Sequence, residues 1–206
     1  SDGIRGTDQN RIGPRRLVGS GLINANQVKL AAGISFLLAA IAGLVLAIMT
    51  SLWLILIGCI AILAAWFYTG GSRPYGYSGY GEVSVFVFFG LVATVGSSYV
   101  QSQTIETISM LCSVPVGLLA SALLVVNNFR DIETDSETGK QTFAVRLGKA
   151  KTKMFFAFLL LASLGMYVLI AVLYTYLVLI TLVVIPLILK LILSLIHISE
   201  PTRHHV

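Results

Sequence analysis

Six long apolar runs constrain this chain more than any other feature of its sequence. They span about 28–49, 52–68, 83–101, 107–126, 152–173 and 175–192. Each run approaches the roughly 20 residues that an α-helix needs to cross the ~30 Å hydrocarbon core of a bilayer. Hydrophobic residues make up 56% of the 206-residue chain, and charged residues only 11%. Because the runs are continuous and do not alternate with polar residues, they exclude a transmembrane β-barrel. We predict an all-α fold, a polytopic transmembrane helix bundle.

The basic residues are distributed unevenly among the connections between these runs. The connections near 50–51, 101–106 and 174 are short and carry no Lys or Arg, whereas those at 1–27, 69–82 and 127–151 hold most of the basic residues. With six crossings, the three longer connections lie on one side of the membrane, and the positive-inside rule makes that side cytoplasmic. The net charge of +5 is therefore a topology signal, and we expect no nucleic-acid partner.

A polar cluster follows the fourth apolar run. Asn127, Asp131 and Asp135 recur at every fourth position, so on an α-helix they would share one face. Oxygen ligands stacked in this way suit Mg²⁺ and, through it, a diphosphate. Lys140 and Arg146 follow closely enough to neutralise phosphate oxygens that the metal does not reach. A solvated helix end can show a similar acidic cluster, but the cations favour a metal–diphosphate site.

The connection at 69–82 admits two interpretations. Its many glycines surround Arg73 and Tyr75, and Tyr68 immediately precedes it. Glycines let the backbone approach a ligand closely, and an arginine among them suits an anion. An aromatic belt at the membrane interface would explain the tyrosines equally well. Arg73 favours anion binding.

The N-terminal connection also admits two interpretations. Asp2 and Asp8 precede Arg11 and Arg15. The aspartates are either the tail of a second acidic motif or part of a flexible Gly/Asp turn. The sequence begins with neither a start methionine nor a signal peptide, so we expect it to begin within a longer protein.

The last residues of the sequence fit poorly with the rest. Residues 193–206 resemble the translation of an adapter used to build sequencing libraries, so we expect a non-native tail there and a native domain over 1–192. His197, His204 and His205 are the three histidines of the chain, and all fall in this tail. We therefore exclude zinc chemistry and histidine acid–base chemistry.

Three motifs, in order along the chain, resemble those of one family. The segment 127–148 is similar to the second aspartate-rich motif of the UbiA superfamily of intramembrane prenyltransferases. The segment 68–82, the run 85–90, and Tyr99 with Gln101 are similar to the branch that prenylates 1,4-dihydroxy-2-naphthoate in menaquinone synthesis. Residues 2–14 resemble the end of the first aspartate-rich motif. The resemblance implies a bundle of nine transmembrane helices around a central cavity, of which this sequence matches the third to the eighth.

The resemblance also implies a reaction and a set of site residues. A polyprenyl chain would pass from its diphosphate to 1,4-dihydroxy-2-naphthoate, with loss of the carboxylate, to give demethylmenaquinone. Mg²⁺ is the implied cofactor, with ligands at Asp2, Asp8, Asp131 and Asp135. Catalytic roles would fall to Asp131, Asp135, Lys140, Arg146 and Tyr68, and substrate binding to Arg11, Arg15, Arg73, Tyr75, Tyr99, Gln101, Asn127 and Asn128.

The expected partners are the polyprenyl diphosphate, the aromatic acid and the lipid bilayer. The expected location is the bacterial inner membrane, with the active-site loops in the cytoplasm. Other acceptors, 4-hydroxybenzoate or homogentisate, remain an alternative, which the Tyr-Thr-Gly-Gly sequence at 68–71 disfavours. A membrane transporter is a second alternative, but transporters usually place ionisable residues near the bilayer midplane, and here the charges lie at the ends of the apolar runs. A CDP-alcohol phosphotransferase would show a denser aspartate pattern.

Overall fold

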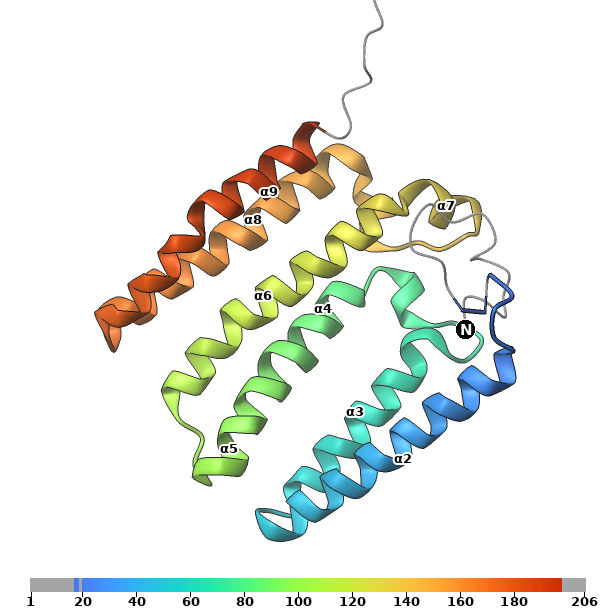
Figure 1. Cartoon of the computed structure of the whole chain (residues 1–206), viewed down its shortest axis with the longest axis horizontal. Coiled ribbons are helices and arrows are strands. Elements are labelled where there is room, and N and C mark those ends of the chain that lie inside the picture. The colour runs from blue at the N-terminus through green and yellow to red at the C-terminus, as the bar shows by residue number, and fades with distance from the viewer. Residues whose placement is uncertain (1–16, 19, 198–206) are drawn as a thin grey trace, which may run out of the picture.

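The computed structural model describes residues 17, 18 and 20–197, and every regular element within them is helical. In chain order these are α2 (Ala25–Met49), α3 (Trp53–Thr69), the 3₁₀ helix η1 (Tyr75–Ser78), α4 (Gly81–Val85), the π-helix η2 (Phe86–Val95), α5 (Gly96–Ser102), α6 (Thr107–Arg130), α7 (Ile132–Glu137), α8 (Phe143–Leu173), the 3₁₀ helix η3 (Tyr176–Val184) and α9 (Ile185–His197). The long helices lie side by side and alternate in direction along the chain (Figure 1). The predicted all-α architecture is confirmed.

Five helical stretches are long and apolar enough to cross a membrane. They are 25–49, 81–102, 107–130, 143–173 and 176–195, and they correspond to five of the six predicted runs. The remaining run, 52–68, forms α3, which is apolar and has 17 residues. At 1.5 Å per residue α3 is about 25 Å long, which is at the short end of the range for spanning helices. The five spanning stretches make the chain an integral membrane protein.

Helix α6 lies between η2 and α8 and packs against both. The contact with η2 is very close, because a Cβ atom added to Gly90 would lie only 2.6 Å from the Cα atom of Gly117. Small residues at such crossings let helix backbones approach each other in lipid. The contact with α8 is an apolar cluster that includes Ala122, Val125, Phe129, Phe156, Leu159 and Leu160. Together the two contacts fix the position of the C-terminal end of α6, where the polar cluster begins.

Helix α8 begins at Phe143, earlier than the predicted start at 152. The prediction followed hydropathy and so excluded the lysine-rich segment before 152. The first turn forms because the side-chain oxygen of Thr142 accepts a hydrogen bond from the backbone N–H of Val145 at 3.4 Å. Gly148 has a left-handed backbone conformation, with φ 73°, so 143–147 is a separate helical turn before the membrane-spanning part of α8.

Two other predicted helices depart from regular α-helix. The run at 83–101 contains the π-helix η2, and the run at 175–192 begins as the 3₁₀ helix η3. Pro186 is the second residue of α9, and proline is tolerated in the first turn of an α-helix. Helix α9 continues to His197, across the predicted boundary at 192, and the assignment of 193–206 to a non-native tail stays a prediction.

Candidate active site

The polar cluster lies where α6 ends and α7 begins. Asp131 separates the two helices, with backbone angles φ −95° and ψ 8°. Two hydrogen bonds nevertheless continue across the junction, from Asp131 N–H to the Asn127 carbonyl at 3.3 Å and from Asp135 N–H to the Asp131 carbonyl at 2.8 Å. The helix is therefore interrupted, yet the three residues keep the four-residue hydrogen-bond spacing that their sequence positions predict.

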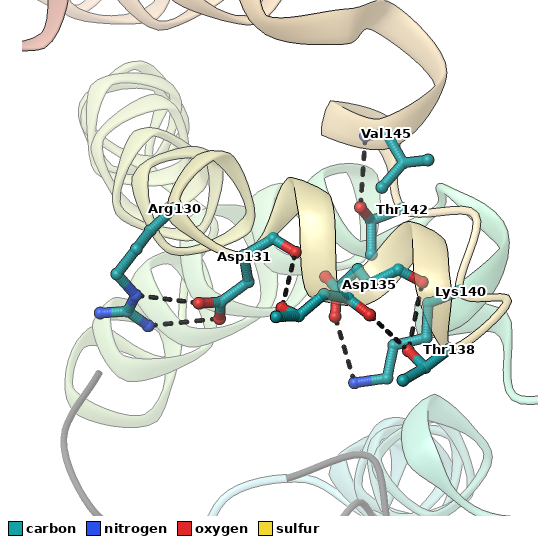
Figure 2. Close-up of polar contacts among 8 residues, drawn as sticks. Arg130, Asp131, Asp135, Thr138, Lys140, Thr142 and Val145 are labelled. Carbon is teal, nitrogen blue, oxygen red and sulfur yellow. Dashed lines mark hydrogen bonds and ion pairs between the residues drawn. The ribbon is translucent and has the colours of Figure 1, made fainter. Parts of the chain in front are cut away.

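Both aspartate side chains are buried, and each contacts a cation. Asp131 is 7% exposed and Asp135 is 9% exposed. The Arg130 guanidinium donates to both carboxylate oxygens of Asp131, through Nε at 3.0 Å and through its terminal nitrogen at 3.3 Å. The Lys140 ammonium lies 3.4 Å from Oδ1 of Asp135. Figure 2 shows the two carboxylates on successive turns with these cations beside them. Charge pairing is what makes two buried carboxylates tolerable so close together.

The end of α7 explains why Lys140 can reach Asp135. Gly139 has a left-handed conformation, with φ +75°. The Lys140 N–H donates to the Asp135 carbonyl at 2.8 Å, and the Gly139 N–H donates to the Ser136 carbonyl at 3.1 Å. This hydrogen-bond pattern, a Schellman motif, turns the chain back along the helix it has just left. The spacing Asp-x-x-x-Gly-Lys thus brings a lysine side chain to the carboxylate five residues before it.

The connection at 69–82 joins this cluster at the same end of the bundle. The Gln141 N–H donates to the Tyr77 carbonyl at 2.9 Å, and the Lys140 ammonium lies 4.8 Å from the centre of the Tyr77 ring. The Arg146 side chain, held by the Gln141 carbonyl at 3.2 Å, passes Gly79 closely enough that a Cβ there would be 3.2 Å from its Nε atom. The two connections therefore form one continuous polar surface.

Tyr68 and Tyr75 pack against each other beside this surface. Their rings meet edge to face, with centroids 5.4 Å apart. The Tyr75 hydroxyl donates to the Ala64 carbonyl at 2.9 Å and shares a hydrogen bond with the Ser84 hydroxyl at 3.0 Å. Both rings are half-buried, whereas Arg73 is exposed. Tyr68 and Tyr75 thus pack against each other at the start of the connection that joins the cluster, and Arg73 of the same connection is exposed.

Two site residues were missed by the sequence analysis. Arg130 directly precedes Asp131, and an arginine next to the aspartate in the sequence could have indicated their ion pair. Glu82 is 6% exposed and accepts a hydrogen bond from the side-chain amide of Asn128, with 2.9 Å between Nδ2 and Oε1. A carboxylate at the start of a membrane-spanning run is costly to bury and is by default a functional candidate, and that argument could have identified Glu82.

Tyr99 and Gln101 do not join the site. They lie in α5, at the opposite end of the 81–102 span from Glu82, about 25 Å away along the helix axis at 1.5 Å per residue. The Gln101 side chain donates to the Ser97 carbonyl of its own helix at 3.0 Å. The structure therefore does not bring these two residues beside the aspartates, and their assignment to substrate binding stays a prediction.

Four predicted site residues, Asp2, Asp8, Arg11 and Arg15, lie outside the described residues. Within 17–18 and 20–197, no group of three or more His, Cys, Asp and Glu side chains is placed to hold a metal. Asp131, Asp135 and the amide oxygen of Asn127 are nevertheless the hard oxygen donors that Mg²⁺ prefers, and Mg²⁺ is often bound by one or two carboxylates together with substrate phosphates. The donors present fit a magnesium–diphosphate complex.

A third acid–base pair lies on the outer surface of α7. The Lys149 ammonium is 2.6 Å from Oε1 of Glu133, and both side chains are more than half exposed. The hydrogen bond from Lys149, with its charge, lowers the pKa of Glu133 below the ordinary value for glutamate. Solvent-exposed pairs of this kind contribute little to stability, so Glu133 is a surface counterpart of the buried aspartates.

Comparison with known proteins identifies one matching family and several relatives of this chain. The model of the UbiA prenyltransferase family matches residues 3–205. The chain is 52% identical over 160 residues to 1,4-dihydroxy-2-naphthoate octaprenyltransferase of Mycobacterium tuberculosis, covering 78% of this chain and 55% of that protein. It is 41% identical over 170 residues to the protein of the same name from Escherichia coli, covering 79% and 55%.

A third relative has a name that indicates a different activity. The chain is 33% identical over 144 residues to 2-carboxy-1,4-naphthoquinone phytyltransferase of Synechocystis, covering 66% of this chain and 44% of that protein. The chain spans about half the length of the curated relatives it matches. No solved structure matches it.

Proposed function

The chain belongs to the UbiA prenyltransferase family, and we propose that the full-length protein transfers a polyprenyl chain from its diphosphate to 1,4-dihydroxy-2-naphthoate. The naphthoate loses its carboxylate and the product is demethylmenaquinone. The names of the relatives from M. tuberculosis and E. coli support this acceptor and this donor. The protein lies in the bacterial inner membrane, with the connections at 69–82 and 127–151 facing the cytoplasm, as the positive-inside rule favours.

The observation that carries the proposal is the pair of buried carboxylates, Asp131 and Asp135, each beside its own cation. A metal–diphosphate complex needs carboxylates that bind the metal and cationic side chains that contact the phosphate oxygens. This cluster supplies both within a few residues. The cluster lies at the end of an apolar bundle, so a diphosphate bound there can leave its prenyl chain among the apolar helices. A transporter gate would require neither feature.

Asp131 and Asp135, with Asn127, would hold Mg²⁺, which neutralises charge on the diphosphate when bound and so makes it a better leaving group. Arg130 and Lys140, now on the carboxylates, would donate to phosphate oxygens in the substrate complex. Arg146 adds a third cation on the same surface. As the bond between the prenyl carbon and oxygen breaks, negative charge grows on the diphosphate, and donors of this kind typically contribute about 10²–10³ in rate each.

Tyr68 and Tyr75 would stabilise the opposite charge. Breaking that bond leaves an allylic cation, and the face of an aromatic ring attracts a cation without reacting with it. The edge-to-face contact between the two rings fixes their orientation before the substrate binds. The naphthoate ring carbon then forms the new bond to the prenyl carbon.

Substitution of Asp131 tests the proposal. In membranes that contain the full-length protein, Asp131→Asn is expected to reduce Mg²⁺-dependent prenyl transfer about 10²–10³-fold. Glu133→Gln is the matched control, because Glu133 is an acid of the same loop that lies at the surface, and it should retain near wild-type activity. Near-normal transfer by the Asp131 variant would contradict the assignment of the diphosphate site.

The acceptor is tested separately with the wild-type protein. Purified full-length protein is supplied with 1,4-dihydroxy-2-naphthoate, 4-hydroxybenzoate and homogentisate in turn. Preference for either of the last two would refute the acceptor and leave the diphosphate site intact. Absence of a prenylated product with all three would refute prenyl transfer itself.

A further inference from the structure

Glu82 is buried at the cluster, and half of its carboxyl group has no partner. It lies in the first turn of α4 and is 6% exposed. Oε1 accepts the hydrogen bond from Asn128, and the backbone carbonyl of Glu82 accepts one from the Ser121 hydroxyl at 3.0 Å. Oε2 is buried and has no hydrogen-bond partner among the described residues. Two side chains thus fix this residue, and neither reaches its second oxygen.

An acceptor left unsatisfied in this way is energetically unfavourable. Burying a polar group without a hydrogen bond typically costs about 1–3 kcal/mol, and more when the group is charged. Among the cations at the site, Arg130 and Lys140 contact the two aspartates and Arg146 donates to the Gln141 carbonyl. A fold that holds a carboxyl group so firmly with one oxygen unpaired is suited to receive a donor from a bound molecule.

The position of Glu82 indicates which molecule. Asn128, its partner, is three residues before Asp131, and residues three apart on a helix are neighbours. On its other side, a Cβ on the adjacent Gly81 would lie 3.0 Å from the Tyr68 hydroxyl. Glu82 is therefore linked through Asn128 to the helix end that carries Asp131, and its neighbour Gly81 lies beside Tyr68. The second substrate must approach near these residues to reach the carbon that leaves the diphosphate.

We propose that Glu82 determines acceptor specificity, with Oε2 accepting a hydrogen bond from a ring hydroxyl of the aromatic acceptor while Asn128 holds Oε1. This rests on the proposed function. Reacting carbons must come within about 3–3.5 Å of each other, so the acceptor ring must lie beside the diphosphate, and Asn128 links Glu82 to the helix end that carries Asp131. A hydroxyl that donates to a carboxylate also increases electron density in its ring, which favours attack on an allylic cation.

The test compares Glu82→Gln with wild type in the full-length protein. Glutamine has nearly the same shape, and its oxygen can still accept from Asn128, but an N–H group replaces the Oε2 acceptor. The KM for 1,4-dihydroxy-2-naphthoate should rise about 10- to 100-fold, as expected when a buried hydroxyl loses its acceptor. The KM for the polyprenyl diphosphate should stay within about twofold of wild type. Glu133→Gln should change neither value.

Acceptor analogues make the test specific. Analogues with a single ring hydroxyl replaced by methoxy cannot donate at that position. Wild type should discriminate strongly against one of them, and Glu82→Gln should lose that discrimination. An unchanged acceptor KM, or discrimination retained by the glutamine variant, would overturn the proposal.

A purely structural role is distinguished by exchanging the pair. The double variant Glu82→Gln with Asn128→Asp keeps one carboxylate and one amide in contact with their positions reversed. Restoration of both melting temperature and acceptor KM by this exchange would overturn the proposal. Restored stability without restored KM supports it. If Glu82→Gln does not fold, Glu82→Asp retains the carboxylate and should keep the discrimination among analogues at a raised KM; loss of discrimination by this variant would overturn the proposal.

The failure of this proposal differs from the failure of the proposed function. If wild type prenylates a different hydroxylated acceptor, the naphthoate assignment is wrong, and the same comparison of KM values is made with that acceptor. If wild type prenylates the naphthoate and Glu82→Gln has the same acceptor KM as wild type, only the role of Glu82 is refuted.

Discussion

The turn at Gly139 offers a quantitative test of how the site is assembled. Gly139 ends α7 in the left-handed conformation, and the hydrogen bonds around it turn Lys140 back toward Asp135. A Cβ atom at Gly139 would have no atom within 4 Å. Replacement by alanine therefore introduces no clash with a neighbour, and its effect comes from the backbone conformation alone.

The magnitude follows from the cost of that conformation. A residue with a Cβ atom pays about 1–2 kcal/mol to adopt it, which corresponds to roughly a 5- to 30-fold change in population. When the turn relaxes, Lys140 moves away from Asp135 and from the proposed diphosphate site. Gly139→Ala should therefore reduce kcat/KM for the polyprenyl diphosphate about 5- to 30-fold, less than the loss expected for Asp131→Asn.

The assay measures initial rates against polyprenyl diphosphate, together with thermal unfolding of the full-length protein. Gly139→Asn is the informative companion, because asparagine adopts the left-handed conformation more readily than alanine does, and it should retain more activity. Gly165→Ala is the control, since Gly165 lies within α8 with open space around it. Wild-type rates for Gly139→Ala, or equal losses for alanine and asparagine, would refute this account of how Lys140 is positioned.

Two further predictions concern the bundle. Gly90→Ala places a Cβ atom 2.6 Å from the backbone of α6 and should destabilise the protein by about 1–3 kcal/mol, measured by thermal unfolding. Gly33→Ala, whose Cβ meets no atom within 4 Å, is the control. Equal stability of the two variants would contradict the close packing of η2 against α6. In a cysteine-free background, Ser72→Cys should react with a membrane-impermeant thiol reagent only from the cytoplasmic side and Thr104→Cys only from the opposite side, and reversed labelling would refute the proposed topology.

Much of the fold was predictable because one physical requirement dominates it. A helix that crosses a bilayer must be apolar for most of its length, so the runs alone located every long helix. The errors arose where hydropathy is not the deciding factor. The first turn of α8 depends on the Thr142 cap and on the backbone conformation of Gly148, and the π-helix η2 has no counterpart in the apolar pattern.

The site was predictable only where residues are neighbours along the chain. Asp131, Asp135 and Lys140 come together through local hydrogen bonds, which their spacing encodes. Glu82 meets Asn128 only through tertiary packing, and spacing does not encode such a contact. The position of Tyr99 and Gln101 at the far end of their span was also predictable, because the charge distribution puts the connection after them on the opposite side of the membrane.

The backbone hydrogen bond from Gln141 to Tyr77 affects what mutagenesis of this site can detect and which amino-acid changes the two positions tolerate. Main-chain atoms make the link, and every amino acid except proline carries both the donor and the acceptor. Alanine substitutions at 141 or 77 would therefore leave the two loops joined. An alanine scan would therefore not detect this hydrogen bond. Proteins with other side chains at these two positions can still form it.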